Sequence, residues 1–183
     1  NKEWVGPSEQ NLQQALAYSK SLSIPHLSAL QLIKNKINEG DYLDYISPKI
    51  KNLIPNPKIF LDMEKGSLRL RRALEQKEAV AIFADYDVDG TVSAALISLW
   101  LRNFNIKPTI YIPDRETEGY GPNIKAMNKL ALNHSLIICV DCGTDTEDAI
   151  RGATERGVDV IVIDHHKSDT FSKSAYAIIN PNR

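Results

Sequence analysis

The stretch AVAIFADYDVDGTVSAALISLWLR, residues 79–102, predicts a strand, a turn and a helix in direct succession. Its first six residues form an apolar run of the kind found in buried strands. Three carboxylates follow, at Asp85, Asp87 and Asp89. A Gly-Thr step then opens a second apolar segment, residues 91–102, which has the length of a helix. So much negative charge at the edge of a core requires a compensating partner, which the rest of the chain has to supply or bind.

The alternation of strand and helix continues to the end of the chain. Short apolar runs predict strands at residues 79–84, 108–112, 135–140, 159–163 and 175–180. Between them, helices are expected at residues 91–102, 123–132 and 146–157, the last preceded by a Thr144–Glu147 capping box. Continuous apolar strands separated by helices are typical of parallel sheets that are covered on both sides. We therefore predict an α/β fold, a parallel sheet with helices on both faces.

The first part of the chain has a different pattern, with apolar residues at helical spacing. The predicted helices cover residues 8–22, 26–37 and 62–77. Ser8 stands at the N-cap position of the first helix, and residues 47–60, which hold three prolines, predict a connector. We therefore predict an α-helical amino-terminal region at residues 1–76, followed by an α/β region at residues 77–183.

Composition excludes some classes of protein. The 183 residues are 43% hydrophobic and carry a formal net charge of -1, as in an ordinary globular domain that is not strongly basic. A nucleic-acid contact would need a local basic surface. Arg69, Arg71 and Arg72 form one such group, unless they are an ordinary solvated helix face. No apolar run approaches the roughly 20 residues of a membrane span, so we expect no membrane partner.

The two cysteines, Cys139 and Cys142, form a C-x-x-C pair. Redox motifs of this form open a helix, whereas Cys139 lies within a predicted strand, so we interpret it as a small buried side chain. This cysteine usage predicts a reducing, cytoplasmic location. The chain starts without Met and ends abruptly in IINPNR, and we expect it to be a piece of a longer protein.

Polar residues follow three of the predicted strands at the point where each strand ends. Asp85 follows the first, Asp141 the third, and Asp164-His165-His166 the fourth. Ligands of open parallel sheets bind beyond the carboxyl ends of the strands, so these side chains are expected at one edge. A single Asp there is usually a turn or cap residue, but three such strand ends together predict a metal site.

The chemistry of these side chains indicates which metal would bind. Carboxylate and imidazole ligands without thiolates suit Mn²⁺ or Mg²⁺, with Zn²⁺ or Fe less favoured. Several carboxylates can bridge two ions about 3.5–4 Å apart, as in two-metal hydrolysis of phosphodiesters. His166, next to a predicted ligand, could contact the scissile phosphate or transfer a proton.

Four ordered motifs resemble the DHH phosphoesterase superfamily. They are ADYDVDGTVSAAL at 84–96, IPDRETEGYGPN at 112–123, VDCGT at 140–144 and IDHH at 163–166. Within the superfamily, the second motif and the helical lead-in with Trp4 are similar to the RecJ group of single-stranded-DNA-specific exonucleases. The resemblance covers nearly the whole chain. It implies a metal-dependent exonuclease that digests single-stranded DNA from 5′ to 3′ in DNA repair and recombination, with single-strand-binding protein as a further partner.

The resemblance also implies roles for individual residues. The expected metal ligands are Asp85, Asp87, Asp141 and His165. These four and His166, which is expected near the phosphate, are the implied catalytic residues. Asp164 and Asp89 would support the ligands without binding the ions themselves. The expected substrate contacts are Gly90, Thr91, Arg115, Tyr120 and His166, where Arg115 would hold a phosphate and Tyr120 would stack on a base.

Two departures from the family pattern limit what the chain is expected to do alone. Residue 84 is Ala where the group often has Gly. The family's further metal-binding Asp and its second, substrate-binding lobe lie downstream of Asp-His-His, and the chain stops 17 residues after His166. We therefore expect two ions in the full-length protein and weak or absent nuclease activity for this chain by itself.

Three alternatives remain from the residues. DVDGTV, starting at Asp87, fits the first motif of a haloacid-dehalogenase-type phosphatase, in which Asp87 would be the nucleophile and Asp89 the acid/base. Another phosphodiesterase or a pyrophosphatase of the DHH superfamily would use the same metals. A non-catalytic, receiver-like domain would bind one Mg²⁺ at its clustered acids, with Lys167 as its lysine.

Overall fold

The computed structural model describes residues 5–183, so Trp4 lies outside the described residues. The chain forms two compact units, Asn1–Pro55 and Asn56–Arg183. Within the described residues, the helices are too short or too polar to cross a membrane.

The first unit contains small helices with little interior. Helices α1 (Glu9–Ser21) and α2 (His26–Lys34) pack against each other, and the Ser8 side chain caps α1 by accepting a hydrogen bond from the amide of Asn11. A 3₁₀ turn, η1 (Glu39–Asp41), and two short helices, α3 (Tyr42–Ile46) and α4 (Ile50–Leu53), follow. The predicted connector at 47–60 is therefore interrupted by α4 and by the 3₁₀ turn η2 (Pro57–Ile59).

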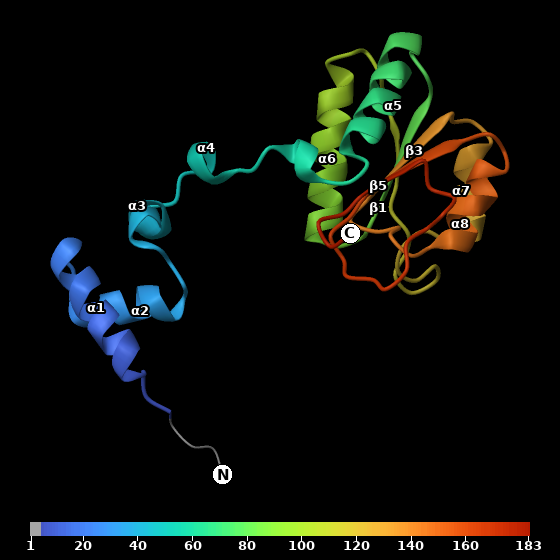
Figure 1. Cartoon of the computed structure of the whole chain (residues 1–183). Helices are drawn as coiled ribbons and strands as arrows, with labels where there is room; N and C mark the ends of the chain where they lie inside the picture. The colour runs from blue at the N-terminus through green and yellow to red at the C-terminus, as the bar shows by residue number, and fades with distance from the viewer. Residues whose placement is uncertain (1–4) are drawn as a thin grey trace. The chain divides into compact units, whose positions relative to one another are not determined.

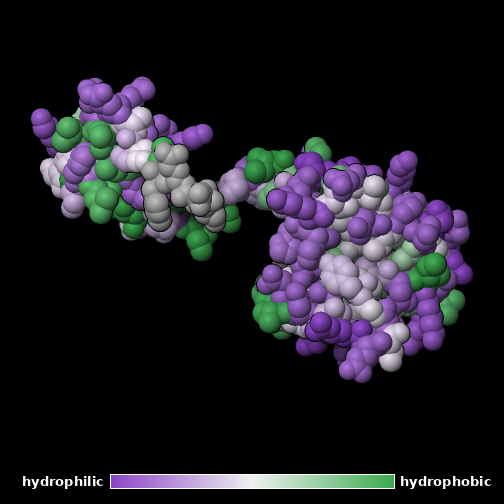
Figure 2. Space-filling model, turned by 90° about the horizontal axis from the view of Figure 1, so that it is seen from below, coloured by the Kyte–Doolittle hydropathy of each residue, from purple (hydrophilic) through white to green (hydrophobic). Residues whose placement is uncertain are grey.

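Much apolar surface of the first unit stays exposed. Leu27 is 79% exposed and Leu43 is 72% exposed, whereas Ala15, Ala29 and Leu32 are buried. Figure 2 shows apolar side chains of this unit at the surface between hydrophilic ones. Its helices are thus amphipathic elements with a small core, as expected for helices of this length.

The second unit is built on a five-stranded parallel sheet, which confirms the predicted fold class. The strands are β1 (Val80–Ala84), β2 (Thr109–Tyr111), β3 (Leu136–Val140), β4 (Asp159–Ile163) and β5 (Ala177–Ile179). They lie in the order β2-β1-β3-β4-β5, and all neighbours are parallel. The chain leaves β1 toward β2 and returns on the other side of β1 to form β3. In doubly wound sheets, this switch point is where ligands bind.

Helices cover both faces of the sheet (Figure 1). Helices α5 (Met63–Gln76) and α6 (Val88–Arg102) pack on one face, where strand residues such as Ile82 and Ile138 point. Helices α7 (Ile124–Ala131) and α8 (Glu147–Thr154) pack on the other, against residues such as Phe83 and Val162. Because successive side chains of a strand point to opposite faces, apolar residues at every position fill both layers.

Helix α5 belongs to the second unit. The compact units divide after Pro55, whereas the change of hydrophobic pattern predicted a division after residue 76. The difference arises because α5 packs against β5 and closes one face of the sheet.

The interpretation of Arg69 as part of a solvated or DNA-contacting surface is wrong. Its side chain is 4% exposed, and its guanidinium contacts Asp159 Oδ2 at 2.5 Å and Glu78 Oε2 at 2.7 Å. Arg71 and Arg72, by contrast, are well exposed. The buried guanidinium therefore joins α5 to the start of β4, a structural role.

Candidate metal centre at the carboxyl ends of the strands

The acids that follow β1, β3 and β4 meet at one edge of the sheet. Strands β3 and β4 pair in a register that sets Val140 beside Ile163, so the residues that follow, Asp141 and Asp164, leave the sheet side by side. Strand β1 pairs with β3 at Ala84 and Val140, which places Asp85 next to them. The parallel arrangement thus brings three strand ends together as the sequence predicted.

Two overlapping groups of side chains could each hold a cation. One consists of Asp85, Asp87 and Asp141, and the other of Asp141, His165 and His166. Within each group, one potential ligand atom per residue lies within 4.8 Å of the others. Because Asp141 belongs to both groups, its carboxylate could bridge two neighbouring ions.

Two buried carboxylate oxygens support a cation at this place. Among the described residues, Asp85 Oδ1 and Asp141 Oδ2 have no hydrogen-bond partner, although Asp85 is 3% exposed and Asp141 is 6% exposed. A buried polar atom without a partner is rare and costs free energy, and a divalent ion would satisfy both oxygens. The donor set therefore fits a hard cation with oxygen and nitrogen ligands.

Electrostatics around Asp141 lead to the same conclusion. Burial and the neighbouring Asp87 carboxylate raise the pKa of Asp141 to about 6. His165 lies on its other side, with Nε2 3.0 Å from Asp141 Oδ1. Crowded carboxylates of this kind hold a proton more tightly until a cation replaces it.

Asp87 has a second task at the start of α6. Its Oδ1 accepts a hydrogen bond from the amide of Gly90 at 3.0 Å and so caps the helix. This hydrogen bond holds the pKa of Asp87 below its ordinary value. Gly90 cannot carry a side chain, because a Cβ atom there would overlap the backbone of Asp85. The turn therefore requires glycine to bring Asp87 close to Asp85.

The predicted phosphate-facing residues at this turn are already engaged. The Gly90 amide is used by Asp87, and the Thr91 hydroxyl donates to the Asp87 carbonyl at 2.7 Å. Asp89 lies at the rim of a pocket of about 300 Å³, lined also by Asp141, His165 and apolar residues of α6 and β4. The expected support of the ligands by Asp89 and the expected substrate contacts of Gly90 and Thr91 remain predictions.

Asp164 lies behind the paired histidines rather than among the ligand atoms. Its Oδ1 accepts from the amides of His165 and His166 and from His166 Nδ1, the last at 2.7 Å. Its Oδ2 accepts from the Thr144 hydroxyl at 2.6 Å and the Thr144 amide at 3.2 Å. Burial alone would raise the pKa of Asp164, but these donors hold it below the ordinary value.

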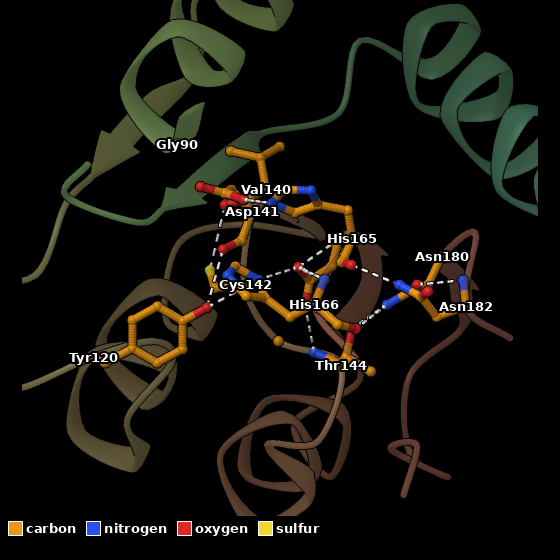
Figure 3. Close-up of polar contacts among 12 residues, drawn as sticks. Gly90, Tyr120, Val140, Asp141, Cys142, Thr144, His165, His166, Asn180 and Asn182 are labelled. Carbon is orange, nitrogen blue, oxygen red and sulfur yellow. Dashed lines mark hydrogen bonds and ion pairs between the residues drawn. The ribbon is translucent and has the colours of Figure 1, made fainter. Parts of the chain in front are cut away.

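The two histidine rings lie beside Asp141 and Tyr120 (Figure 3), and both are exposed to solvent. The hydrogen bond to Asp164 raises the pKa of His166. Because His166 Nδ1 faces Asp164, Nε2 is the ring nitrogen left for a ligand. His165 and His166 lie edge to face, with ring centroids 4.8 Å apart.

Tyr120 reaches the site from the loop that follows β2. Its hydroxyl donates to the backbone carbonyl of Asp141 at 3.3 Å and lies 3.2 Å from His166 Nδ1. Its neighbour in the predicted substrate surface, Arg115, lies over the ring of Tyr86, with 5.6 Å from Cζ to the ring centroid. The loop therefore brings Tyr120 into the site, and the stacking and phosphate contacts predicted for Tyr120 and Arg115 remain predictions.

Three residues that contact the Asp-His-His segment were not predicted to belong to the site: Thr144, Asn180 and Asn182. The side-chain amides of Asn180 and Asn182 donate to the carbonyls of His166 and His165, at 3.0 and 2.6 Å. Thr144 was assigned to a capping box with Glu147, and this is wrong. Its hydroxyl bonds to Asp164, while the Glu147 carboxylate accepts from Ser172 and Ser174. Asn180 follows strand β5, so the rule that identified the acids would have found it too.

Comparison with known proteins identifies relatives of this architecture. Residues 79–183 match the DHH family, N-terminal domain. The chain is 36% identical over 122 residues to the single-stranded-DNA-specific exonuclease RecJ of Bacillus subtilis, covering 66% of this chain and 16% of that protein. It is 31% identical over 135 residues to RecJ of Escherichia coli, covering 73% of this chain and 23% of that protein.

Solved structures agree with the fold. RecJ from Thermus thermophilus in complex with Mn²⁺ superposes with a TM-score of 0.73 at 22% identity, over 97% of this chain and 24% of that one. An exonuclease RecJ bound to manganese gives a TM-score of 0.62 at 28% identity, over 67% of this chain and 31% of that one. The chain thus spans between 16% and 23% of the length of the two curated relatives.

Proposed function

The chain belongs to the DHH family, and we propose that its second unit holds Mn²⁺ or Mg²⁺ for the hydrolysis of phosphodiester bonds in single-stranded DNA. The observation that carries this proposal is the pair of buried, unpartnered carboxylate oxygens of Asp85 and Asp141. These oxygens lie where strands end together, and a divalent cation would compensate their charge. The RecJ relatives, named as single-stranded-DNA-specific exonucleases, support the substrate.

We assign the ion ligands from the two groups of side chains. Asp85, Asp87 and Asp141 would hold one ion, and Asp141 with His165 would hold the other, so Asp141 would serve both. When bound, such ions lower the pKa of a water molecule and stabilise charge on the phosphoryl oxygens. Asp164 keeps His166 Nδ1 occupied, which leaves Nε2 of His166 to contact the scissile phosphate.

The remaining residues would bind and orient the DNA. Arg115 is a candidate phosphate contact and Tyr120 a candidate base contact, since both lie on the loop beside the acids. Gly90 and Thr91, at the start of α6, are further candidate substrate contacts, while Asp89 would support the ion ligands. Because the chain spans a small part of its curated relatives, we propose that it supplies one side of a substrate cleft and is weakly active or inactive by itself.

The cellular role follows from the same family. We propose digestion from 5′ to 3′ in DNA repair and recombination, next to single-strand-binding protein, in the cytoplasm. The free, buried thiols of Cys139 and Cys142 are consistent with a reducing location. Membership in the DHH family argues against the haloacid-dehalogenase and receiver-like alternatives, whereas other substrates of the family, such as dinucleotides or pyrophosphate, need an experimental test.

The experiment is a titration of the 183-residue chain with Mn²⁺ by calorimetry, followed by hydrolysis assays. We expect saturable Mn²⁺ binding that Asp85→Asn and Asp141→Asn abolish and that Asp145→Asn, a change at an exposed position, leaves intact. Slow release of nucleotides from single strands labelled at the 5′ end, with dinucleotides and pyrophosphate untouched, would support the substrate. Mn²⁺ binding that survives both substitutions would refute the site.

A further inference from the structure

The last strand of the sheet contributes a buried amide to the site. Asn180 follows β5 directly and is 1% exposed. Its Nδ2 donates to the Thr144 hydroxyl oxygen at 2.9 Å and to the His166 carbonyl at 3.0 Å, and its Oδ1 accepts from the Asn182 amide at 2.9 Å. Figure 3 shows Asn180 and Asn182 facing the backbone of the two histidines.

The orientation of this amide follows from its partners. A flipped Asn180 would direct its oxygen at the His166 carbonyl, which cannot donate, and its NH₂ group at the Asn182 N–H. With NH₂ facing Thr144, the Thr144 oxygen accepts from Asn180 and its own proton is free for Asp164 Oδ2, 2.6 Å away. In this series of hydrogen bonds from Asn180 to Thr144 to Asp164, each residue therefore determines the direction of the next hydrogen bond.

The chain of hydrogen bonds ends at the imidazole of His166. Asp164 Oδ2 accepts hydrogen bonds from the Thr144 amide and hydroxyl, and Asp164 Oδ1 accepts one from His166 Nδ1 at 2.7 Å. Nδ1 must then carry the proton, and Nε2 carries the lone pair in the neutral ring. We propose that Asn180 is a positioning residue, which acts through Thr144 and Asp164 to hold His166 with Nε2 free for a phosphate.

The expected effect of Asn180 on phosphate binding rests on the proposed function, whereas the hydrogen bonds that lead from Asn180 to His166 do not. Hydrogen bonds that orient a metal-binding or catalytic imidazole are worth about 10- to 100-fold in metal affinity or activity. Asn182 holds the carbonyl of His165 in the same way, so the Asn-Pro-Asn segment fixes the backbone of both histidines. Of Asn180 and Asn182, only Asn180 contacts Thr144 in the described structure. We therefore assign the orientation of the His166 ring to Asn180.

Two isosteric substitutions remove different hydrogen bonds of this series. Asn180→Asp keeps the shape but removes both N–H donors, and Thr144→Val keeps the shape but removes the hydroxyl. Thr144→Ser retains the hydroxyl and serves as the conservative rescue. Asn133→Asp makes the same amide-to-carboxylate change at an exposed position. Thermal unfolding of each variant checks that it folds.

The first readout needs no metal. Long-range ¹H–¹⁵N spectra of the metal-free chain in alkaline buffer report the tautomer of each imidazole, and the four histidines can be assigned by single substitutions. We expect the Nδ1–H form of His166 in the wild type, Thr144→Ser and Asn133→Asp, and a mixture of tautomers in Asn180→Asp and Thr144→Val.

The second readout is the affinity for inorganic phosphate in saturating Mn²⁺, measured by calorimetry, because His166 Nε2 is assigned to the phosphate. We expect Asn180→Asp and Thr144→Val to bind phosphate about 10- to 100-fold more weakly, while Thr144→Ser stays within about threefold of the wild type. A wild-type tautomer and affinity in Thr144→Val would overturn the proposal, also if Asn180→Asp does not fold. If the wild type binds no Mn²⁺, the proposed function fails, and the tautomers still decide the role of Asn180.

Discussion

Asp141 Oδ1 lies 3.0 Å from His165 Nε2, although the two residues follow different strands. The register of β3 and β4, which pairs Val140 with Ile163, creates this contact. It closes one side of the cluster of carboxylates, whose other side is formed by Asp85 and Asp87 after β1. The position of Asp141 between two acids and two imidazoles makes it the residue on which the metal-binding proposal depends most.

Replacing this carboxylate should stabilise the metal-free chain and remove its response to metal. Folding raises the pKa of Asp141 from 3.8 to about 6, so its ionisation destabilises the fold as pH rises through that interval. Asp141→Asn should therefore raise the melting temperature at pH 7 without metal. Mn²⁺ at 100 times its Kd should stabilise the wild type by about 2.7 kcal/mol and the variant by nothing. A variant that melts earlier, or that still responds to Mn²⁺, would contradict this expectation.

Glycine at position 90 should be indispensable. A methyl group there would overlap the Asp85 backbone, so Gly90→Ala must displace either β1 or the start of α6. We expect a loss of about 3 kcal/mol in the free energy of unfolding, together with loss of Mn²⁺ binding, because Asp85 and Asp87 move apart. Gly40→Ala, where no atom lies within 4 Å of the added group, is the matched control and should change little. Equal stability of both variants, measured by urea unfolding, would show that the turn tolerates a side chain.

Arg69 and Arg71, two arginines of the same helix, should differ sharply in their contribution to stability. Arg69→Met leaves Glu78 and Asp159 without their buried partner, which should cost about 3 kcal/mol. Arg71→Met removes only an exposed contact with Glu75 and should cost less than about 0.5 kcal/mol. Urea unfolding of both variants measures the difference. Similar losses in the free energy of unfolding would show that the buried ion pairs of Arg69 do not stabilise the fold.

Glu147 should make stability depend on acid pH. Its carboxylate accepts hydrogen bonds from Ser172 and Ser174, which lower its pKa from 4.5 to about 2. A lowered carboxyl pKa stabilises the fold above pH 4.5, and this contribution is lost as pH falls toward 2. Glu147→Gln should therefore unfold at lower urea than the wild type at pH 7 and at the same urea near pH 2.

The control for this pH dependence is Glu155→Gln. Glu155 is 67% exposed, and its contact with Arg151 is long, at 3.9 Å. Its effect on the urea midpoint should be small at both pH values. A difference between wild type and Glu147→Gln that stays constant from pH 7 to pH 2 would mean that the carboxylate charge plays no part.

Most of the sheet could be predicted because its evidence is local. The apolar runs that became β1, β3 and β4 are continuous, and a polar residue ends each of them. In a parallel sheet all such ends share one edge, so the meeting of Asp85, Asp141 and His165 required no knowledge of strand order. The exact register affects the distances between these groups, but not the edge on which they lie.

The partners of the other polar side chains could not be predicted in this way. Thr144 and Glu147 have the spacing of a capping box, but each finds a partner in a distant segment, Asp164 for one and Ser172 with Ser174 for the other. A local pattern specifies which hydrogen bonds a side chain can form with its neighbours in sequence. A partner from a distant segment competes with those local hydrogen bonds.

The sequence by itself determined that the chain forms a parallel sheet and that its acids and histidines gather at the carboxyl ends of the strands, because hydrophobic spacing and chain direction are written in consecutive residues. Only the tertiary structure decided that Arg69 is buried while Arg71 is exposed, since Asp159, which holds it, lies 90 residues away. The same holds for Asn180, whose place behind His166 exists only once β5 has paired with β4. Contacts between distant segments depend on the packing of whole elements, and no stretch of consecutive residues contains that information.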